Sequence, residues 1–301
     1  MDFLTAQKEV SEALGLDITN TSTATKVKRW LNLSYQNIVG NYNWSWLKDY
    51  TTVTLKIDYT SGTVSVGIGG STLTFDAVIS ESQTGRFIQF TTSRAWYKIT
   101  AHTARTATAT IDPVYAESTA ITDGAFTIRS IYYSLPSTVE HVIGARQTTF
   151  PLALEVMDRT RYNEFVWWSN LVGATRAVIP SGLDSSGNWQ FTPYPFPNQP
   201  YILEFYYLKR ISDITGDTAS PIFPRRFESI WVEGALCYGY RFLDDTRYEN
   251  SFTLFGNTVR DMWSHDEPMQ NHHWIVKPYD QIPANRGLML PAEYGANQGN
   301  S

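Results

Sequence analysis

Residues 23–47 constrain the fold of this chain more than any other stretch. Apolar residues recur within them at spacings of three and four: Val27, Leu31, Tyr35, Ile38 and Tyr42. Because this spacing matches the period of an α-helix, the stretch predicts a long helix with one apolar face. The hydroxyl residues 21–23 are candidate caps for its first turn, and Gly40 with Asn41 is typical of a helix end.

Two tryptophans, Trp44 and Trp46, follow this helix and alternate with polar residues. Alternation is the period of a strand, so the stretch is predicted to begin an extended segment. Large aromatic side chains are mostly buried in folded proteins. We therefore expect both indoles to fill the core beneath the helix, with stacking on a ligand as the alternative.

Composition and charge limit the classes of protein to consider. The 301 residues are 42% hydrophobic, 18% charged and 14% aromatic, which suits two modest domains or one domain with a large insertion. The net charge of −5 argues against a general nucleic-acid binder held by phosphate contacts. The single cysteine, Cys237, excludes an intramolecular disulfide and a zinc site made of cysteines. Neither a signal peptide nor a run of about 18 apolar residues is present, so no membrane span is predicted.

From residue 50 onward the pattern changes to a period of two, in which apolar residues alternate with threonine and lysine. Short runs of this kind, separated by turn residues, continue to residue 133. They predict a small antiparallel β-barrel or sandwich with threonine-rich outer faces. Gly67, Gly69 and Gly70 lie within it, but no Gly-Lys-Ser/Thr follows them. A hairpin turn is therefore favoured over a phosphate-binding loop.

Residues 134–220 are expected to be rich in β-structure as well. Residues 201–208 form the strongest strand pattern of the chain. The prolines of residues 193–200 predict a rigid extended connector before that strand. Residues 152–170 are ambiguous, with a loose pattern that favours a helix.

Two more helices are predicted near the C-terminus, after Pro221 and Pro224, because proline is well tolerated in a first helical turn. Apolar residues repeat in them at helical spacing: Phe227, Trp231, Ala235, Tyr238 and Phe242, then Tyr248, Phe252, Phe255, Val259 and Met262. We expect this pair of helices to pack onto the helix of residues 23–47.

The predicted fold is of the α+β class. N-terminal helices (residues 1–49) and C-terminal helices (residues 221–264) form an antiparallel bundle in this prediction. A β-barrel or sandwich insertion (residues 50–133) and a β-rich middle segment (residues 134–220) lie between them in the sequence. Residues 265–301 hold four prolines but are too apolar for a plain disordered tail. They predict an extended arm that orders against a neighbouring molecule.

The chain offers little catalytic chemistry. It contains neither a Gly-x-Ser-x-Gly nor a His-Glu-x-x-His motif, so no enzyme and no cofactor are predicted. The nearest approach to a metal site is a group of polar residues: His265, Asp266, Glu267, His272 and His273. An intervening proline and the lack of a helical histidine pair favour a solvated polar loop instead, so no metal is expected.

Four segments occur in an order that resembles the head-to-tail adaptor (connector, head-completion or tail-tube) proteins of tailed bacteriophages. They are NYNWSWL, YYSLPSTVEHV, NWQFTPYPFPNQPYILEFYYLKR and SPIFPRRFESIWVEGALCYGYRFLDD. The resemblance covers most of the chain and implies a structural virion protein at the head-to-tail interface, assembled in the host cytoplasm. Such adaptors form a ring, usually dodecameric, beneath the portal vertex. The DNA passes through the ring without being read.

The resemblance implies the portal protein, tail or nozzle proteins and further copies of the chain as partners, and no membrane. An acidic protein suits a DNA channel, because few cations are present to hold the polyanion. Candidate residues of the portal or neighbour interface are Arg225, Arg226, Trp274, Ile275 and Tyr279. The two arginines oppose the dipole at a helix start. An acidic partner surface is one explanation, and simple solvation is the other.

Two other functions stay open. A virion tail or surface protein could bind host glycans through the β insertion, which exposed coplanar Trp or Tyr side chains around a shallow groove would indicate. A hydrolase with an unusual site would instead show clustered carboxylates in one deep pocket.

Overall fold

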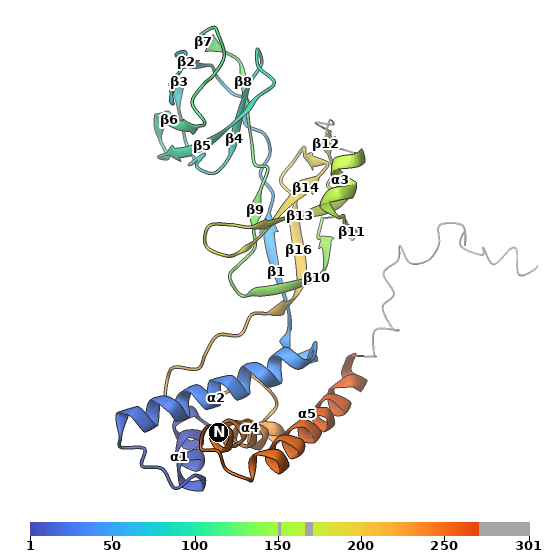
Figure 1. Cartoon of the computed structure of the whole chain (residues 1–301). Helices are drawn as coiled ribbons and strands as arrows, with labels where there is room; N and C mark the ends of the chain where they lie inside the picture. Colours follow the sequence, from blue (N-terminus) through green and yellow to red (C-terminus); the bar gives the residue numbers. More distant parts are fainter. Residues whose placement is uncertain (150–151, 166–170, 271–301) are drawn as a thin grey trace, which may run out of the picture. The chain divides into compact units, whose positions relative to one another are not determined.

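The computed structural model describes residues 1–149, 152–165 and 171–270 (Figure 1). The chain is mixed α+β, which confirms the predicted class. It divides into two compact units. Unit 1 comprises Met1–Asp49 and Tyr207–Ser301, and unit 2 comprises Tyr50–Tyr206.

The described part of unit 1 contains four long helices: α1 (Phe3–Ala13), α2 (Thr21–Asn41), α4 (Glu228–Phe242) and α5 (Tyr248–Gln270). α2 and α5 each pack against α4, and α1 packs against both α2 and α4. α2 is the helix predicted from residues 23–47. Its cap is Asn20, one residue before the predicted hydroxyl residues, because the Asn20 side chain accepts a hydrogen bond from the Ser22 N–H at 2.9 Å.

The core of unit 1 is centred on Trp231 of α4, which is fully buried. Its indole N–H donates to the carbonyl oxygen of Leu31 at 2.8 Å, and its ring stacks on Phe3 with centroids 5.8 Å apart. One turn later, a Cβ on Gly234 would lie 2.1 Å from the Ser34 Oγ. Glycine at this position therefore lets α4 approach α2 closely.

The predicted apolar face of α4 is only partly right. Trp231 and Ala235 are buried, but Phe242 is exposed and Tyr238 is half-buried. Ile230 and Cys237, which the prediction left out, are buried instead. The reason is that α2 and α5 both contact α4, so its buried surface is wider than one stripe.

Trp44 is buried in the same core, and its indole N–H donates to the Ile38 carbonyl at 2.8 Å, which confirms the core prediction. Trp46 packs at the edge of the core and stacks on Trp44 with centroids 5.7 Å apart. The predicted extended start is wrong, because Ser45–Leu47 form a 3₁₀ helix, η1. The Asp266 carboxylate accepts hydrogen bonds from the Ser45 N–H, at 2.7 Å, and from the Ser45 hydroxyl.

The same contact corrects the predicted end of the last helix. α5 continues to Gln270, so residues 265–270 are neither an extended arm nor a solvated loop. Burial of Met262 and the Asp266 hydrogen bonds to Ser45 favour these additional turns. Residues 271–301, with His272 and His273, lie outside the described residues.

Between α4 and α5, burial raises the pKa of Glu233, and a hydrogen bond from Thr258 opposes this shift. A raised folded-state pKa contributes stability below the unfolded value of about 4.3, and this contribution is lost as pH rises through the folded pKa. Glu233→Gln should therefore stabilise the chain at pH 7 by less than about 1 kcal/mol and have little effect near pH 4. Thermal unfolding at both pH values checks this, and an equal effect at both would contradict it.

Within unit 2, one sheet forms a small barrel. Its strands are β2 (Val64–Val66), β3 (Thr72–Ile79), β4 (Phe87–Phe90), β5 (Trp96–His102), β6 (Thr106–Asp112), β7 (Ile121–Gly124) and β8 (Phe126–Arg129). They pair in the order β7-β2-β3-β6-β5-β4-β8. Because only Ala125 separates β7 from β8, the two ends of this order are one continuous stretch and the sheet closes.

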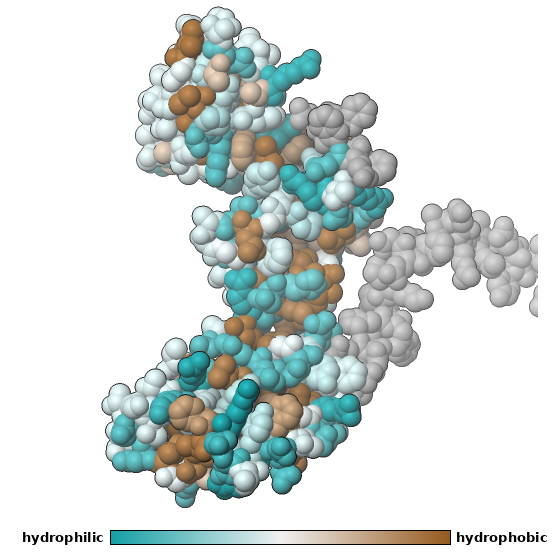
Figure 2. Space-filling view, viewed as in Figure 1, coloured by the Kyte–Doolittle hydropathy of each residue, from teal (hydrophilic) through white to brown (hydrophobic). Residues whose placement is uncertain are grey.

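The barrel encloses its own apolar core, which includes Leu73, Ile88, Phe90, Ile99 and Ile128. Its outer surface in Figure 2 is largely pale, of intermediate hydropathy, as the threonine-rich strands predict. Gly69 has a φ of +68°, and the Gly70 N–H donates to the Gly67 carbonyl at 2.9 Å. The predicted hairpin turn is thus confirmed.

A second sheet contains β1 (Lys48–Thr54), β9 (Tyr133–Ser134), β10 (Val139–Gln147), β11 (Leu152–Val156), β13 (Ala177–Leu183), β14 (Trp189–Tyr194) and β16 (Ile202–Lys209). Their order is β1-β16-β10-β11-β13-β14-β9. β12 (Val172–Gly173) and β15 (Phe196–Pro197) form a short parallel pair. β16 is the strand that residues 201–208 predict.

Two predictions for this region are wrong. Residues 152–170 do not form one helix: β11 comes first, followed by the short helix α3 (Arg159–Phe165). Pairing of Leu154 with Ala145 of β10 favours the strand. The proline-rich connector is partly strand, because Pro193 pairs with Val178 of β13. β9 on the other side pairs only with Gln190 and Phe191, so no ladder bond there needs a proline N–H.

Candidate functional site: the joint of unit 2 and an arginine surface on unit 1

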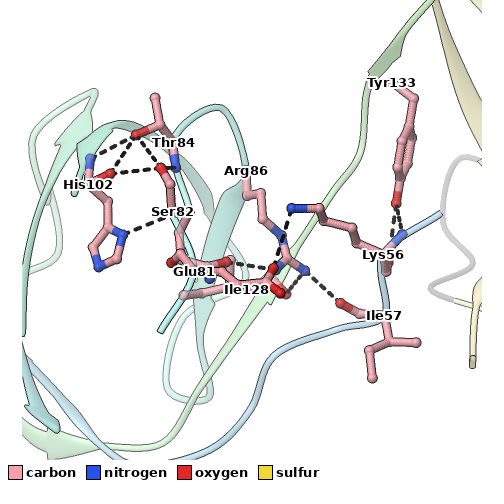
Figure 3. A network of polar contacts seen from close by, with 10 residues as sticks. Lys56, Ile57, Glu81, Ser82, Thr84, Arg86, His102, Ile128 and Tyr133 are labelled. Atoms are coloured by element: carbon pink, nitrogen blue, oxygen red, sulfur yellow. Dashed lines mark hydrogen bonds and ion pairs between the residues drawn. The ribbon is translucent and has the colours of Figure 1, made fainter. Parts of the chain in front are cut away.

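Two buried arginines of unit 2, Arg86 and Arg129, lie where the barrel meets the second sheet. Arg86, just before β4, is almost fully buried. Its Nη2 donates to the carbonyl oxygens of Ile57, at 2.6 Å, and Ile128, at 3.0 Å, as Figure 3 shows. Its Nη1 donates to the Gln83 Oε1 at 2.7 Å. Burial lowers the Arg86 pKa. One guanidinium thus joins the strand that enters the barrel to the strand that leaves it.

Arg129, the last residue of β8, makes a second joint. Its side chain is 7% exposed and forms a bidentate ion pair with Asp58, in which Nε lies 3.0 Å from Oδ1 and Nη2 lies 2.6 Å from Oδ2. The guanidinium lies 4.4 Å from the Phe196 ring centroid and 5.3 Å from that of Trp96. Phe196 belongs to β15 and Trp96 to the barrel strand β5. The ion pair and both rings therefore hold the barrel against the rest of unit 2.

Tyr133 of β9 links the two edges of the second sheet. Its hydroxyl accepts a hydrogen bond from the Lys56 N–H at 2.9 Å and donates to the Lys56 carbonyl at 3.2 Å (Figure 3). Lys56 follows β1, so the hydroxyl connects β9 with the chain beyond β1. The rings of Phe191 and Phe205 also meet, with centroids 4.6 Å apart, although other strands separate β14 from β16. The sheet is therefore strongly curled. Burial raises the Tyr133 pKa, which keeps the hydroxyl protonated.

His102 of β5 holds the loop of residues 82–84 through hydrogen bonds. Its Nδ1 accepts a hydrogen bond from the Gln83 N–H at 3.1 Å, and its carbonyl oxygen accepts bonds from the Ser82 and Thr84 hydroxyls (Figure 3). Sequence reasoning missed this joint altogether. The available signal was weak: two isolated arginines in strands otherwise rich in threonine and apolar residues.

On unit 1, the sequence-predicted residues Arg225 and Arg226 lie in the 3₁₀ helix η2 (Arg225–Phe227), directly before α4. Both side chains are exposed. The Arg226 guanidinium lies 4.6 Å from the Phe227 ring centroid, and the Phe227 ring lies 6.1 Å from that of His265 in α5. We call these four residues the η2 surface. It combines two accessible guanidinium groups with an aromatic ring.

The other predicted interface residues, Trp274, Ile275 and Tyr279, lie outside the described residues. Within the described part of the chain, no group of three or more histidine, cysteine, aspartate or glutamate residues could hold a metal ion. Of the suspected metal group, Asp266 instead serves the contact with Ser45. No described helix has the length and hydropathy that crossing a membrane requires.

The buried arginines and the tyrosine hold strands together, while the exposed arginines lie beside a helix start, as suits a structural protein that contacts others. The model of the SU10 adaptor protein family matches residues 86–273, which is more than half of the chain. The chain belongs to this family. It is a structural adaptor protein of bacteriophages, a component of the virion that interacts with other capsid or tail proteins. The curated proteins contain no match to it.

Proposed function

We propose that the chain is a head-to-tail adaptor that forms a ring between the portal and the tail, with twelve copies as is usual in the adaptors it resembles. The observation that carries this proposal is the family match, which covers residues of both units. A ring requires a heterologous interface, in which one patch of a copy meets a different patch of the next. The net charge of −5 supports passage of DNA without retention.

In this proposal, unit 1 forms an antiparallel bundle that touches the portal, and unit 2 faces outward or toward the tail and nozzle proteins. Size-exclusion chromatography with light scattering tests it, using the chain alone and mixed with the portal protein of the same genome. We expect both proteins in one complex of ring size. Separate elution at every salt concentration would overturn the proposal.

The η2 surface is the proposed contact with an acidic surface of the portal. The variant Arg225→Glu/Arg226→Glu should weaken binding to the portal about 10- to 100-fold, because it places like charges across the interface. A matched control is Arg241→Glu/Arg260→Glu, which changes the net charge equally at exposed positions of α4 and α5. Equal affinity of the two variants in a titration would contradict the assignment.

A further inference from the structure

β1 is the longest edge strand among the described strands. It stands at the end of the strand order of its sheet and pairs with β16 on one side. The Leu55 N–H donates toward β16, to the Tyr201 carbonyl at 2.7 Å, whereas the backbone of Lys56 meets Tyr133 on the opposite side. Because a strand alternates in this way, the backbone groups of Thr52 and Thr54 are directed away from β16.

This edge lacks the usual protection against pairing. Residues 51–54, Thr-Thr-Val-Thr, contain neither a charge nor a proline and favour strand conformation. The barrel in the same unit protects itself by closing, and the opposite edge strand, β9, has only two residues. A strand from another chain can therefore extend the sheet at β1.

The last described helix, α5, contacts the chain just before the start of β1. Asp266 of α5 is bonded to Ser45, three residues before β1 begins, and α5 ends at Gln270. Residues 274–277, Trp-Ile-Val-Lys, follow four residues later and have a strand-forming composition. The seven residues from 271 to 277 can span up to about 25 Å when extended.

Ring symmetry places the neighbour's β1 at the same height as the copy's own β1. Copies in a ring are related by rotation about one axis, which preserves height along that axis and distance from it. A segment that leaves one copy at the level of its own β1 start is therefore at the level of the neighbour's β1 start. Only the separation around the ring has to be crossed.

We propose that residues 274–277 of one copy add as a strand to the edge of β1 in the neighbouring copy. This inference rests on the proposed ring and identifies the surface on which the C-terminal arm orders. Backbone hydrogen bonds to Thr52 and Thr54 supply the pairing, and addition of the strand covers an aggregation-prone edge once the ring forms.

Disulfide trapping between two separately purified variants tests the contact. One variant carries Thr52→Cys, and the other carries cysteine at position 274, 275, 276 or 277, because opposed residues of paired strands fall within disulfide distance. The native Cys237 is inert, since burial and the Glu233 charge raise its pKa to about 11. After assembly with the portal protein and mild oxidation, we expect a reducible dimer at one or two of the four positions.

The matched control is Thr108→Cys. Thr108 is exposed, but its strand β6 pairs with a strand on each side, so this variant should give no dimer with the same four partners. Absence of a Thr52→Cys dimer at all four positions in assembled rings would overturn the inference. A cross-link found only within a single chain, in a protein carrying both cysteines, would also overturn it.

Two separate proline variants provide a second test that needs no cysteine. Thr52→Pro removes an N–H that points away from β16, so the chain should keep its melting temperature but lose ring assembly. Val53→Pro removes an N–H that faces β16 and should lower the melting temperature. A folded Thr52→Pro variant that assembles normally would refute the strand addition. If the unsubstituted chain itself never joins the portal protein, the proposed function fails instead.

Discussion

Replacing Trp231 with alanine should lower the free energy of unfolding of the chain by about 3–5 kcal/mol. Trp231 is fully buried where α1, α2 and α4 meet, so the truncation leaves a large cavity. It also removes the indole hydrogen bond to the Leu31 carbonyl and leaves that oxygen without its partner. Among the described residues of unit 1, only Trp44 has an equally large, fully buried side chain.

Urea unfolding followed by circular dichroism at the helical band measures this effect, because the long described helices all belong to unit 1. Leu254→Ala is the control in the same unit: Leu254 is 58% exposed, and its truncation should cost less than about 0.5 kcal/mol. A loss below about 1 kcal/mol for Trp231→Ala would contradict the packing described for this core.

The second large effect is expected at the joint of unit 2. Arg129→Met should destabilise unit 2 by about 3–5 kcal/mol, because it leaves the Asp58 carboxylate partly buried without its main partner. The Met side chain retains part of the contact with Phe196, so the loss reports chiefly on the ion pair. Adding Asp58→Asn should recover part of the stability, since the uncompensated charge is then gone.

Hydrogen exchange locates the effect. The N–H of Tyr59 donates to the Ile128 carbonyl at 2.9 Å and the N–H of Ile128 donates back at 2.8 Å, so both amides should lose protection in Arg129→Met. Arg247→Met is the control, because Arg247 pairs with Asp245 at an exposed site of unit 1. Equal protection of Tyr59 and Ile128 in Arg129→Met and in the unsubstituted chain would refute the role of Arg129.

Much of the candidate site was not predictable from local patterns. Arg225 and Arg226 were proposed from the sequence, because two arginines at a helix start conflict with the helix dipole, and their interface role stays a prediction. Arg86, Arg129 and Tyr133 were not, because their partners are 29 to 77 residues away. Whether such a residue is exposed or holds two strands together depends on which distant segments the fold places beside it.

The sequence by itself determined the elements whose signal is local and periodic: α2, the helical pair near the C-terminus, the barrel strands and β16. Periodicity suffices there because one face of each element is buried whatever its partner. The family was also recognisable, from four segments in a characteristic order.

Only the tertiary structure decided the remaining features. The Asp266–Ser45 contact joins residues 221 positions apart and accompanies both the 3₁₀ helix at Ser45–Leu47 and the extension of α5 to Gln270. Pairing with β10 makes β11 a strand where the local pattern favoured a helix. Closure of one sheet and the open edge of the other likewise depend on strand order, which non-local hydrogen bonds determine and local propensity does not.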